Sequence, residues 1–62
     1  LDRDGVREVQ RLLAARGFDP GRPDGVAGPR TRAAIEAYED AHGLAVTGQA
    51  TDRLLERLRA AP

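Results

Sequence analysis

Apolar residues recur every three or four positions in three stretches of the chain, which is the spacing of helices with one buried face. In the first stretch this face is formed by Val6, Val9, Leu12 and Leu13. Asp4 lies just before it, and a carboxylate there can accept hydrogen bonds from the free backbone N–H groups of a first helical turn. We therefore expect a helix over residues 4–16 with Asp4 as its N-cap.

The second stretch begins at Gly28 and Pro29, which suit an N-cap and a first helical residue because proline has no N–H to satisfy there. Its expected buried face comprises Thr31, Ala34, Ile35, Tyr38, Ala41 and His42. The first two stretches both end in a glycine followed by a hydrophobic residue, Gly17-Phe18 and Gly43-Leu44. Such a glycine can adopt the left-handed conformation that ends a helix, which predicts a second helix over residues 29–42.

A third helix is predicted to begin after Thr51 as N-cap, with Asp52 in a first turn where the helix dipole favours negative charge. Its apolar face comprises Leu54, Leu55, Leu58 and Ala61. The turns before the second and third helices share one pattern, in which a glycine is followed by the N-cap and then by two residues of the buried face. At offsets of three, six and ten residues, these positions are Gly25, Gly28, Thr31 and Ile35 in one turn and Gly48, Thr51, Leu54 and Leu58 in the other.

The loop between the first two helices is the longer one, since Gly17 to Gly25 spans eight residues and Gly43 to Gly48 spans five. Prolines within the stretch 19–23 favour a fixed turn there. Strand signals are absent apart from the short run 44–46. The predicted fold class is therefore all-α, a compact three-helix bundle with ordered Gly/Pro loops and an internal turn–helix repeat.

Composition narrows the possible functions. Sixty-two residues suit a single domain (residues 1–62, core about 4–60), and a core of this size supplies only about 3–5 kcal/mol of stability. Without cysteine there is no disulfide or zinc–thiolate site, and without methionine we expect the chain to be excised from a longer protein. Ten arginines balance ten acidic residues, which argues against nucleic-acid binding because that affinity rests on excess positive charge. No apolar run approaches the ~20 residues needed for membrane insertion.

A family resemblance is carried by an ordered set of short motifs. They are Val9-Gln10-x-x-Leu13, Gly17-Phe18, Asp24-Gly25-x-x-Gly28-Pro29-x-Thr31, Ala34-Ile35-x-x-Tyr38-Glu39 and Gly43-Leu44-x-Val46-Thr47-Gly48. Over residues 6–58 the chain resembles the three-helix type of peptidoglycan-binding domain that is attached to bacterial cell-wall enzymes. The resemblance implies a non-catalytic module. We also expect a monomer without cofactor, and no zinc site because one histidine without cysteines cannot form one. Such a module binds the stem peptide and glycan of peptidoglycan and anchors a tethered catalytic or envelope domain in the periplasmic or extracellular cell envelope.

The chain departs from the family pattern in two places. The family usually has Phe-Gln where this chain has Tyr38-Glu39, and this change could alter ligand contacts because a carboxylate cannot donate a hydrogen bond. The last helix is often preceded by Asp-Pro-x-Thr, where this chain has a turn that begins with Thr51 and keeps the capping ability. Related folds also occur as pro-segments and protein-binding modules, so a protein–protein interaction or regulatory module is the alternative function.

Five residues are candidates for ligand contact: Gln10, Asp24, Gly25, Arg30 and Tyr38. Backbone N–H groups around Asp24 and Gly25 could hold a stem-peptide carboxylate at a helix N-terminus, or Asp24 could simply close its own turn while Gly25 supplies a positive φ. Arg30 could pair with such a carboxylate, remain solvated, or pair with Asp24.

The remaining two candidates are uncharged. Gln10 could contact a ligand amide or bond loop backbone that would otherwise be buried without a partner. Tyr38 could stack on a sugar, or pack in the core with its hydroxyl exposed. Tyr38 and Phe18 are the two aromatic residues of the chain, so peptidoglycan recognition should rely on the peptide as much as on the glycan.

Catalysis is not expected, because the chain has no serine or cysteine and its single histidine, His42, has no nucleophile that can be placed beside it. Three arginines, Arg3, Arg7 and Arg11, form a row on the first helix that could face an anionic polymer. A solvated face is the simpler interpretation, with Arg7 pairing with Asp4 and Arg11 with Glu8. A helix-turn-helix DNA binder would need a recognition helix rich in cations, and the second helix instead mixes arginines with acidic residues.

Overall fold

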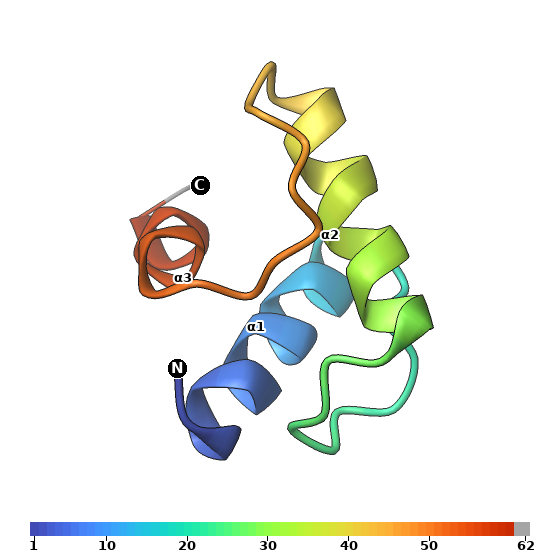
Figure 1. Cartoon of the computed structure of the whole chain (residues 1–62), viewed down its shortest axis with the longest axis vertical. Helices are drawn as coiled ribbons and strands as arrows, with labels where there is room; N and C mark the ends of the chain where they lie inside the picture. Colours follow the sequence, from blue (N-terminus) through green and yellow to red (C-terminus); the bar gives the residue numbers. More distant parts are fainter. Residues whose placement is uncertain (61–62) are drawn as a thin grey trace.

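A computed structural model describes residues 1–60 of the chain and contains three helices (Figure 1). Helix α1 spans Arg3–Ala15, α2 spans Pro29–Ala41 and α3 spans Asp52–Ala60. No strand occurs within residues 1–60. The predicted all-α three-helix fold is confirmed, and Ala61, which was expected on the apolar face of the third helix, lies outside the described residues.

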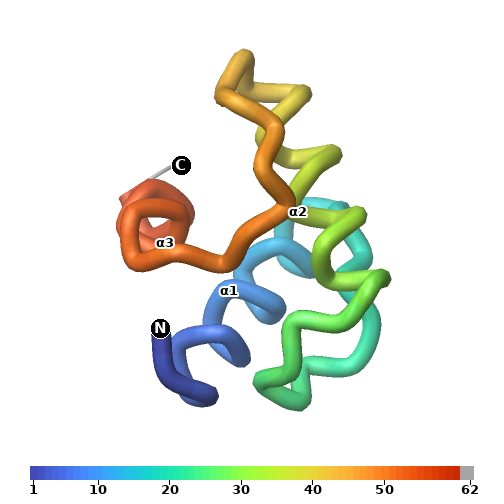
Figure 2. The backbone as a smooth tube through the Cα atoms, viewed as in Figure 1, coloured from blue at the N-terminus to red at the C-terminus, as the bar shows by residue number. Residues whose placement is uncertain are grey.

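Helix α1 is the central element of the bundle. It packs against both α2 and α3, whereas the Cα atoms of α2 and α3 nowhere come within 8 Å of each other (Figure 2). The segment after α2 turns back along that helix and then crosses to the start of α3 (Figure 1). Helices α2 and α3 therefore diverge from a shared contact on α1, and side chains and loop residues occupy the space between them.

Helices α1 and α2 end in the same way, as the glycine-hydrophobic motifs predict. Gly17 and Gly43 have φ angles of 84° and 68°. The N–H of Phe18 bonds the carbonyl of Leu13 at 3.0 Å, and the N–H of Leu44 bonds that of Glu39 at 2.8 Å. These are the six-to-one hydrogen bonds of the Schellman motif, so local sequence alone determines both helix ends.

The start of α1 differs from the prediction, because the N-cap is Asp2 and not Asp4. The Asp2 side chain accepts a hydrogen bond from the N–H of Gly5 at 2.8 Å. Asp4 instead lies within the first turn, where it faces Arg7 at 3.6 Å. The other two caps agree with expectation, since Gly28 precedes α2 and the Thr51 hydroxyl accepts from the N–H of Leu54 at 3.1 Å.

The core is formed where the three apolar faces meet. Its buried members are Val9, Leu13, Ala34, Ile35, Tyr38, Leu54, Leu55 and Leu58, and Leu12, Phe18, Leu44 and Ala50 pack around them. Three polar residues are buried with this cluster, namely Gln10, Thr31 and Glu39. Burying a polar group without partners is costly, so each of these three side chains needs hydrogen-bond partners. Those partners show how the loops are held in place.

Candidate functional site

The side chain of Gln10, on α1, holds the first turn of the repeat. Its Oε1 accepts from the N–H of Gly25 at 2.9 Å. Its Nε2 donates to Thr31 Oγ1 at 2.9 Å, to the Val26 carbonyl at 3.0 Å and to Asp24 Oδ1 at 3.3 Å. Gln10 is fully buried, so its amide is occupied by the loop. Loop bonding is one of the two roles that the sequence allowed for Gln10. Direct contact of Gln10 with a ligand stays a prediction.

Asp24 and Gly25 are both engaged in the backbone of this turn. Asp24 Oδ1 accepts from the N–H of Val26 at 2.9 Å, and this bond, followed by the one from Gln10, lowers the pKa of the Asp24 carboxyl group. Gly25 has a φ of 81°, and a Cβ at this position would lie only 2.7 Å from the carbonyl oxygen of Arg3. The fold thus requires a glycine at position 25, whatever else the turn binds.

Glu39 holds the second turn in the way that Gln10 holds the first. Its Oε1 accepts from the N–H groups of Thr47 at 2.8 Å and Gly48 at 2.9 Å, and its Oε2 accepts from Thr47 Oγ1 at 2.9 Å. Glu39 is only 6% exposed. The carboxylate that was expected to change ligand contacts therefore faces the loop of its own chain.

The two turns are equivalent in construction, with one difference of register. In each, the N–H of a glycine with positive φ bonds a side-chain oxygen of the preceding helix: Gly25 bonds Gln10 and Gly48 bonds Glu39. Gln10 lies seven residues before Gly17, whereas Glu39 lies four residues before Gly43. The difference is close to one helical turn, so the longer first loop reaches about one turn further back along its helix. The repeat in the sequence could have identified Glu39, because the N–H of each turn glycine needs a hydrogen-bond acceptor on the preceding helix.

Two ion pairs that the sequence allowed, Arg30–Asp24 and Arg11–Glu8, are replaced by pairs with other partners. Arg30 lies near the first turn but pairs with Asp19, whose pKa is lowered by the N–H of Gly21 and then by Arg30. Glu8 does not pair with Arg11 as expected. It accepts two hydrogen bonds from Arg59 of α3, at 2.7 Å and 2.6 Å, and this contact lowers the pKa of the Glu8 carboxyl group. The reason is that the apolar face of α3 packs on α1, which brings Arg59 beside Glu8.

Two members of the arginine row on α1, Arg3 and Arg7, also have partners. Arg3 Nε donates to the carbonyl of Asp24 at 3.0 Å, so the first member of the row helps to hold the first turn. Arg7 faces Asp4, as the sequence predicted.

Tyr38, on α2, lies apart from the other four candidates, near the C-terminal ends of α1 and α2. Its ring is fully buried, in an edge-on contact with Phe18 (centroids 5.6 Å apart) and a tilted contact with His42 (4.2 Å apart). The expected core packing is correct, but the expected exposure of its hydroxyl is wrong. Phe18, turned back by the glycine stop, and His42, one helical turn along, enclose the ring. The hydroxyl is buried as well and has no hydrogen-bond partner among residues 1–60.

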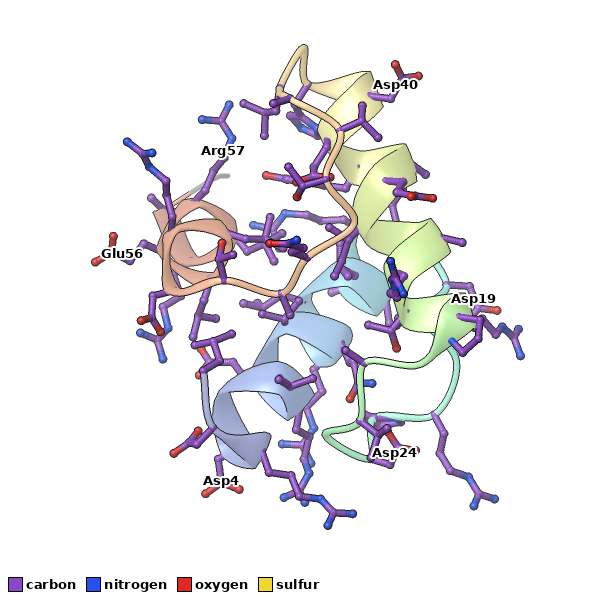
Figure 3. The ribbon with its side chains drawn as sticks, in the orientation of Figure 1. Asp4, Asp19, Asp24, Asp40, Glu56 and Arg57 are labelled. Atoms are coloured by element: carbon purple, nitrogen blue, oxygen red, sulfur yellow. The ribbon has the colours of Figure 1, made fainter. Side chains whose placement is uncertain are left out.

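A groove of about 880 Å³ lies over Tyr38. The residues that line it are Arg16 and Phe18 from the end of α1, Tyr38 and His42 from the end of α2, and Arg53, Glu56, Arg57 and Ala60 from α3. Arg16 donates to the carbonyls of Leu12 and Leu58 and so ties α1 to α3 beneath the groove. Figure 3 shows that Arg57 and Glu56 leave α3 in different directions, with Glu56 pointing away from α2. The groove therefore lies where α2 and α3 diverge, and side chains from both helices line it.

Among residues 1–60 there is no group of three or more histidine, cysteine or acidic residues that could hold a metal ion. None of the helices in this part of the chain is both long enough and apolar enough to span a membrane.

Two crystal structures of SltB3 from Pseudomonas aeruginosa are similar to this chain. The complex with NAG-anhNAM-pentapeptide matches 97% of the chain at 48% identity and a TM-score of 0.92. The complex with NAG-NAM-pentapeptide matches 95% at 49% identity and a TM-score of 0.91. This chain spans 16% of each SltB3 chain.

Relatives with another name also match. The "Putative OxPP cycle protein OpcA" of Nostoc punctiforme is 46% identical over 52 residues, which is 84% of this chain and 11% of that protein. The protein of the same name from Synechocystis is 42% identical over 53 residues, 86% of this chain and 11% of that protein.

The family model described as "Putative peptidoglycan binding domain" matches residues 2–58. This range contains all three helix starts, both glycine stops and both turn glycines. The chain therefore belongs to the peptidoglycan binding domain family.

Proposed function

We propose that this chain is a non-catalytic peptidoglycan-binding module that anchors a tethered domain at the wall of the bacterial cell envelope. The observation that carries the proposal is the similarity to SltB3. A protein that is crystallised with peptidoglycan fragments contains a segment with nearly the same fold and about half of the same residues (TM-score 0.92, 48% identity). An isolated domain of this size offers a small binding surface, so its benefit lies in raising the local concentration of what is attached to it.

A role without chemistry of its own is supported by the side chains. The chain has no serine and no cysteine. The Nδ1 atom of His42 lies 2.9 Å from the carbonyl oxygen of Tyr38, which accepts only, so Nδ1 carries a proton and donates it. The buried polar side chains Gln10 on α1 and Glu39 on α2 each hydrogen-bond to a loop. None of these groups is arranged as a nucleophile with a base.

Sedimentation with purified sacculi tests this function. The domain is expected in the pellet and is expected to be released by soluble muropeptides, because the same site would bind both. Bovine serum albumin serves as a control for trapping. A domain that stays in the supernatant, and whose amide signals do not move on addition of muropeptides, would overturn the proposal.

A second candidate function rests on the OpcA relatives. Their name refers to the OxPP cycle and not to the cell wall, although they match 84–86% of this chain at 42–46% identity. This favours a protein-interaction module on the same fold as the alternative. Amide shifts caused by the domain to which the chain is tethered, together with none caused by muropeptides, would decide for it.

A further inference from the structure

We propose that the groove over Tyr38 is the ligand site, and that it binds the free terminal carboxylate of a peptide with small aliphatic side chains, such as the stem peptide of peptidoglycan. This inference rests on the proposed function and adds to it the part of the ligand that is recognised and the residues that recognise it. Three independent features of the groove support it: an unpaired hydroxyl, two unpaired cations and an apolar lining.

The first feature is the Tyr38 hydroxyl. Buried hydroxyl groups almost always have a hydrogen-bond partner, since leaving one without a partner costs free energy. The Tyr38 hydroxyl is buried without a partner among residues 1–60, and Tyr38 lines the groove. Replacing this tyrosine by phenylalanine would fit the core equally well, so the fold itself gives no reason for the hydroxyl. A ligand oxygen would supply the missing acceptor.

The second feature is the charge on α3. Arg53 and Arg57 are spaced four residues apart and so lie on the same face of the helix, and both line the groove. Neither has a hydrogen bond or ion pair with any residue from 1 to 60. Glu56 also lines the groove, but its carboxylate points away from α2 (Figure 3). Two guanidinium groups at the rim of a groove favour a carboxylate, which arginine can bind through two parallel hydrogen bonds.

The third feature is the lining between these polar groups. Phe18, Ala60 and the rings of Tyr38 and His42 give the groove a mainly apolar surface. Methyl side chains fit such a surface, whereas a bare inorganic anion would leave it wet. The carbonyl oxygens at the end of α2 do not oppose an anion strongly, because the N–H groups of Gly43 and Leu44 already cap those of Asp40 and Glu39.

The hydroxyl of Tyr38 is covered in the free chain. A ligand therefore reaches it only when side chains that line the groove rearrange, and exposed side chains change rotamer within picoseconds to nanoseconds. The turn around Asp24 and Gly25 offers a ligand fewer free groups, because the side chains of Gln10 and Asp24 already bond the N–H groups of Gly25 and Val26.

Isothermal titration of the chain with NAG-NAM-pentapeptide, and with the same compound as its terminal carboxamide, tests the inference. The free acid is expected to bind at least about tenfold more tightly than the amide, because only the acid offers a charged acceptor. Tyr38→Phe is expected to weaken binding of the acid by about tenfold while the urea midpoint stays the same or rises. Arg57→Gln should weaken binding of the acid as well. The matched control is Arg32→Gln, which should leave binding unchanged. Arg32 lies on the other side of α2, in a separate hollow with Ala27 and Glu36.

The outcomes separate the two proposals. If the wild-type chain binds the acid and the amide equally, the terminal carboxylate is not what is recognised. If Tyr38→Phe and Arg57→Gln bind as the wild type does, the groove is not the site. Either result overturns the inference and leaves the peptidoglycan-binding function standing. If the wild-type chain binds neither compound and does not sediment with sacculi, the function itself fails and the inference fails with it.

Discussion

Replacing Glu39 by alanine tests how the second turn is held. In the folded chain its carboxylate accepts three hydrogen bonds, two from backbone N–H groups and one from the Thr47 hydroxyl. Alanine removes both acceptor oxygens and with them all three hydrogen bonds. It also leaves the N–H of Gly48, a buried residue, without a partner.

The expected loss is large compared with the stability of a small domain. A hydrogen bond to a charged group contributes about 1.5–3 kcal/mol, and a buried donor left without a partner costs about 1–3 kcal/mol. Even with partial replacement by water, we expect Glu39→Ala to lower the free energy of unfolding by about 3 kcal/mol. Since a domain of this size has only about 3–5 kcal/mol, the variant should keep no more than about 2 kcal/mol and unfold at a much lower urea concentration.

Glu39→Gln separates geometry from charge. An amide oxygen can keep the two backbone bonds, and the amide nitrogen can donate to the Thr47 hydroxyl, which also accepts. We therefore expect a loss of no more than about 1 kcal/mol. Asp40→Ala, on the exposed side of the same helical turn, is the control and should change stability little.

Urea unfolding followed by circular dichroism at 222 nm measures all three variants, with amide exchange of Gly48 as a local probe. Unfolding free energies for Glu39→Ala and Asp40→Ala that agree within about 0.5 kcal/mol would refute the role assigned to Glu39.

Two further predictions concern the first turn. Gly25→Ala should destabilise the chain by at least about 1 kcal/mol more than Gly17→Ala, because both positions have positive φ but only at Gly25 would the new Cβ meet backbone, 2.7 Å from the Arg3 carbonyl oxygen; equal urea midpoints would contradict this. The pKa of Asp24 is lowered in the folded chain, so its carboxylate stabilises the fold above its ordinary value of 3.8, and that stability is lost as the pH falls through the lower folded value. Asp24→Asn should accordingly reduce the fall of the urea midpoint between pH 5 and about 2, and an unchanged pH profile would count against this assignment.

Features set by neighbouring residues could be predicted from the sequence. The Schellman ends at Gly17 and Gly43 depend on one turn of helix and the next two residues, and both predictions are confirmed. The N-cap of α1 could not be decided in this way. Asp2 and Asp4 can both cap a helix locally, and the structure selects Asp2.

Features that depend on helix packing were beyond local reasoning. The pair Glu8–Arg59 joins residues 51 positions apart, and Arg11 was the nearer partner in sequence. Tyr38 was identified on the apolar face of α2, but the groove above it exists because α2 and α3 each pack on α1 and diverge from one another. Sequence reasoning therefore placed the ligand candidates mainly at the Asp24 turn, which is recognisable as a motif, and did not identify Arg53 and Arg57.

The most direct test of the central claim is an amide chemical-shift titration of the chain with NAG-NAM-pentapeptide. We expect shifts that concentrate around the groove, at Phe18, His42, Arg53 and Arg57, with small changes at the turn of Asp24 and Gly25. Shifts confined to that turn would contradict the assignment of the groove, and no shifts at millimolar ligand would contradict peptidoglycan binding by this chain.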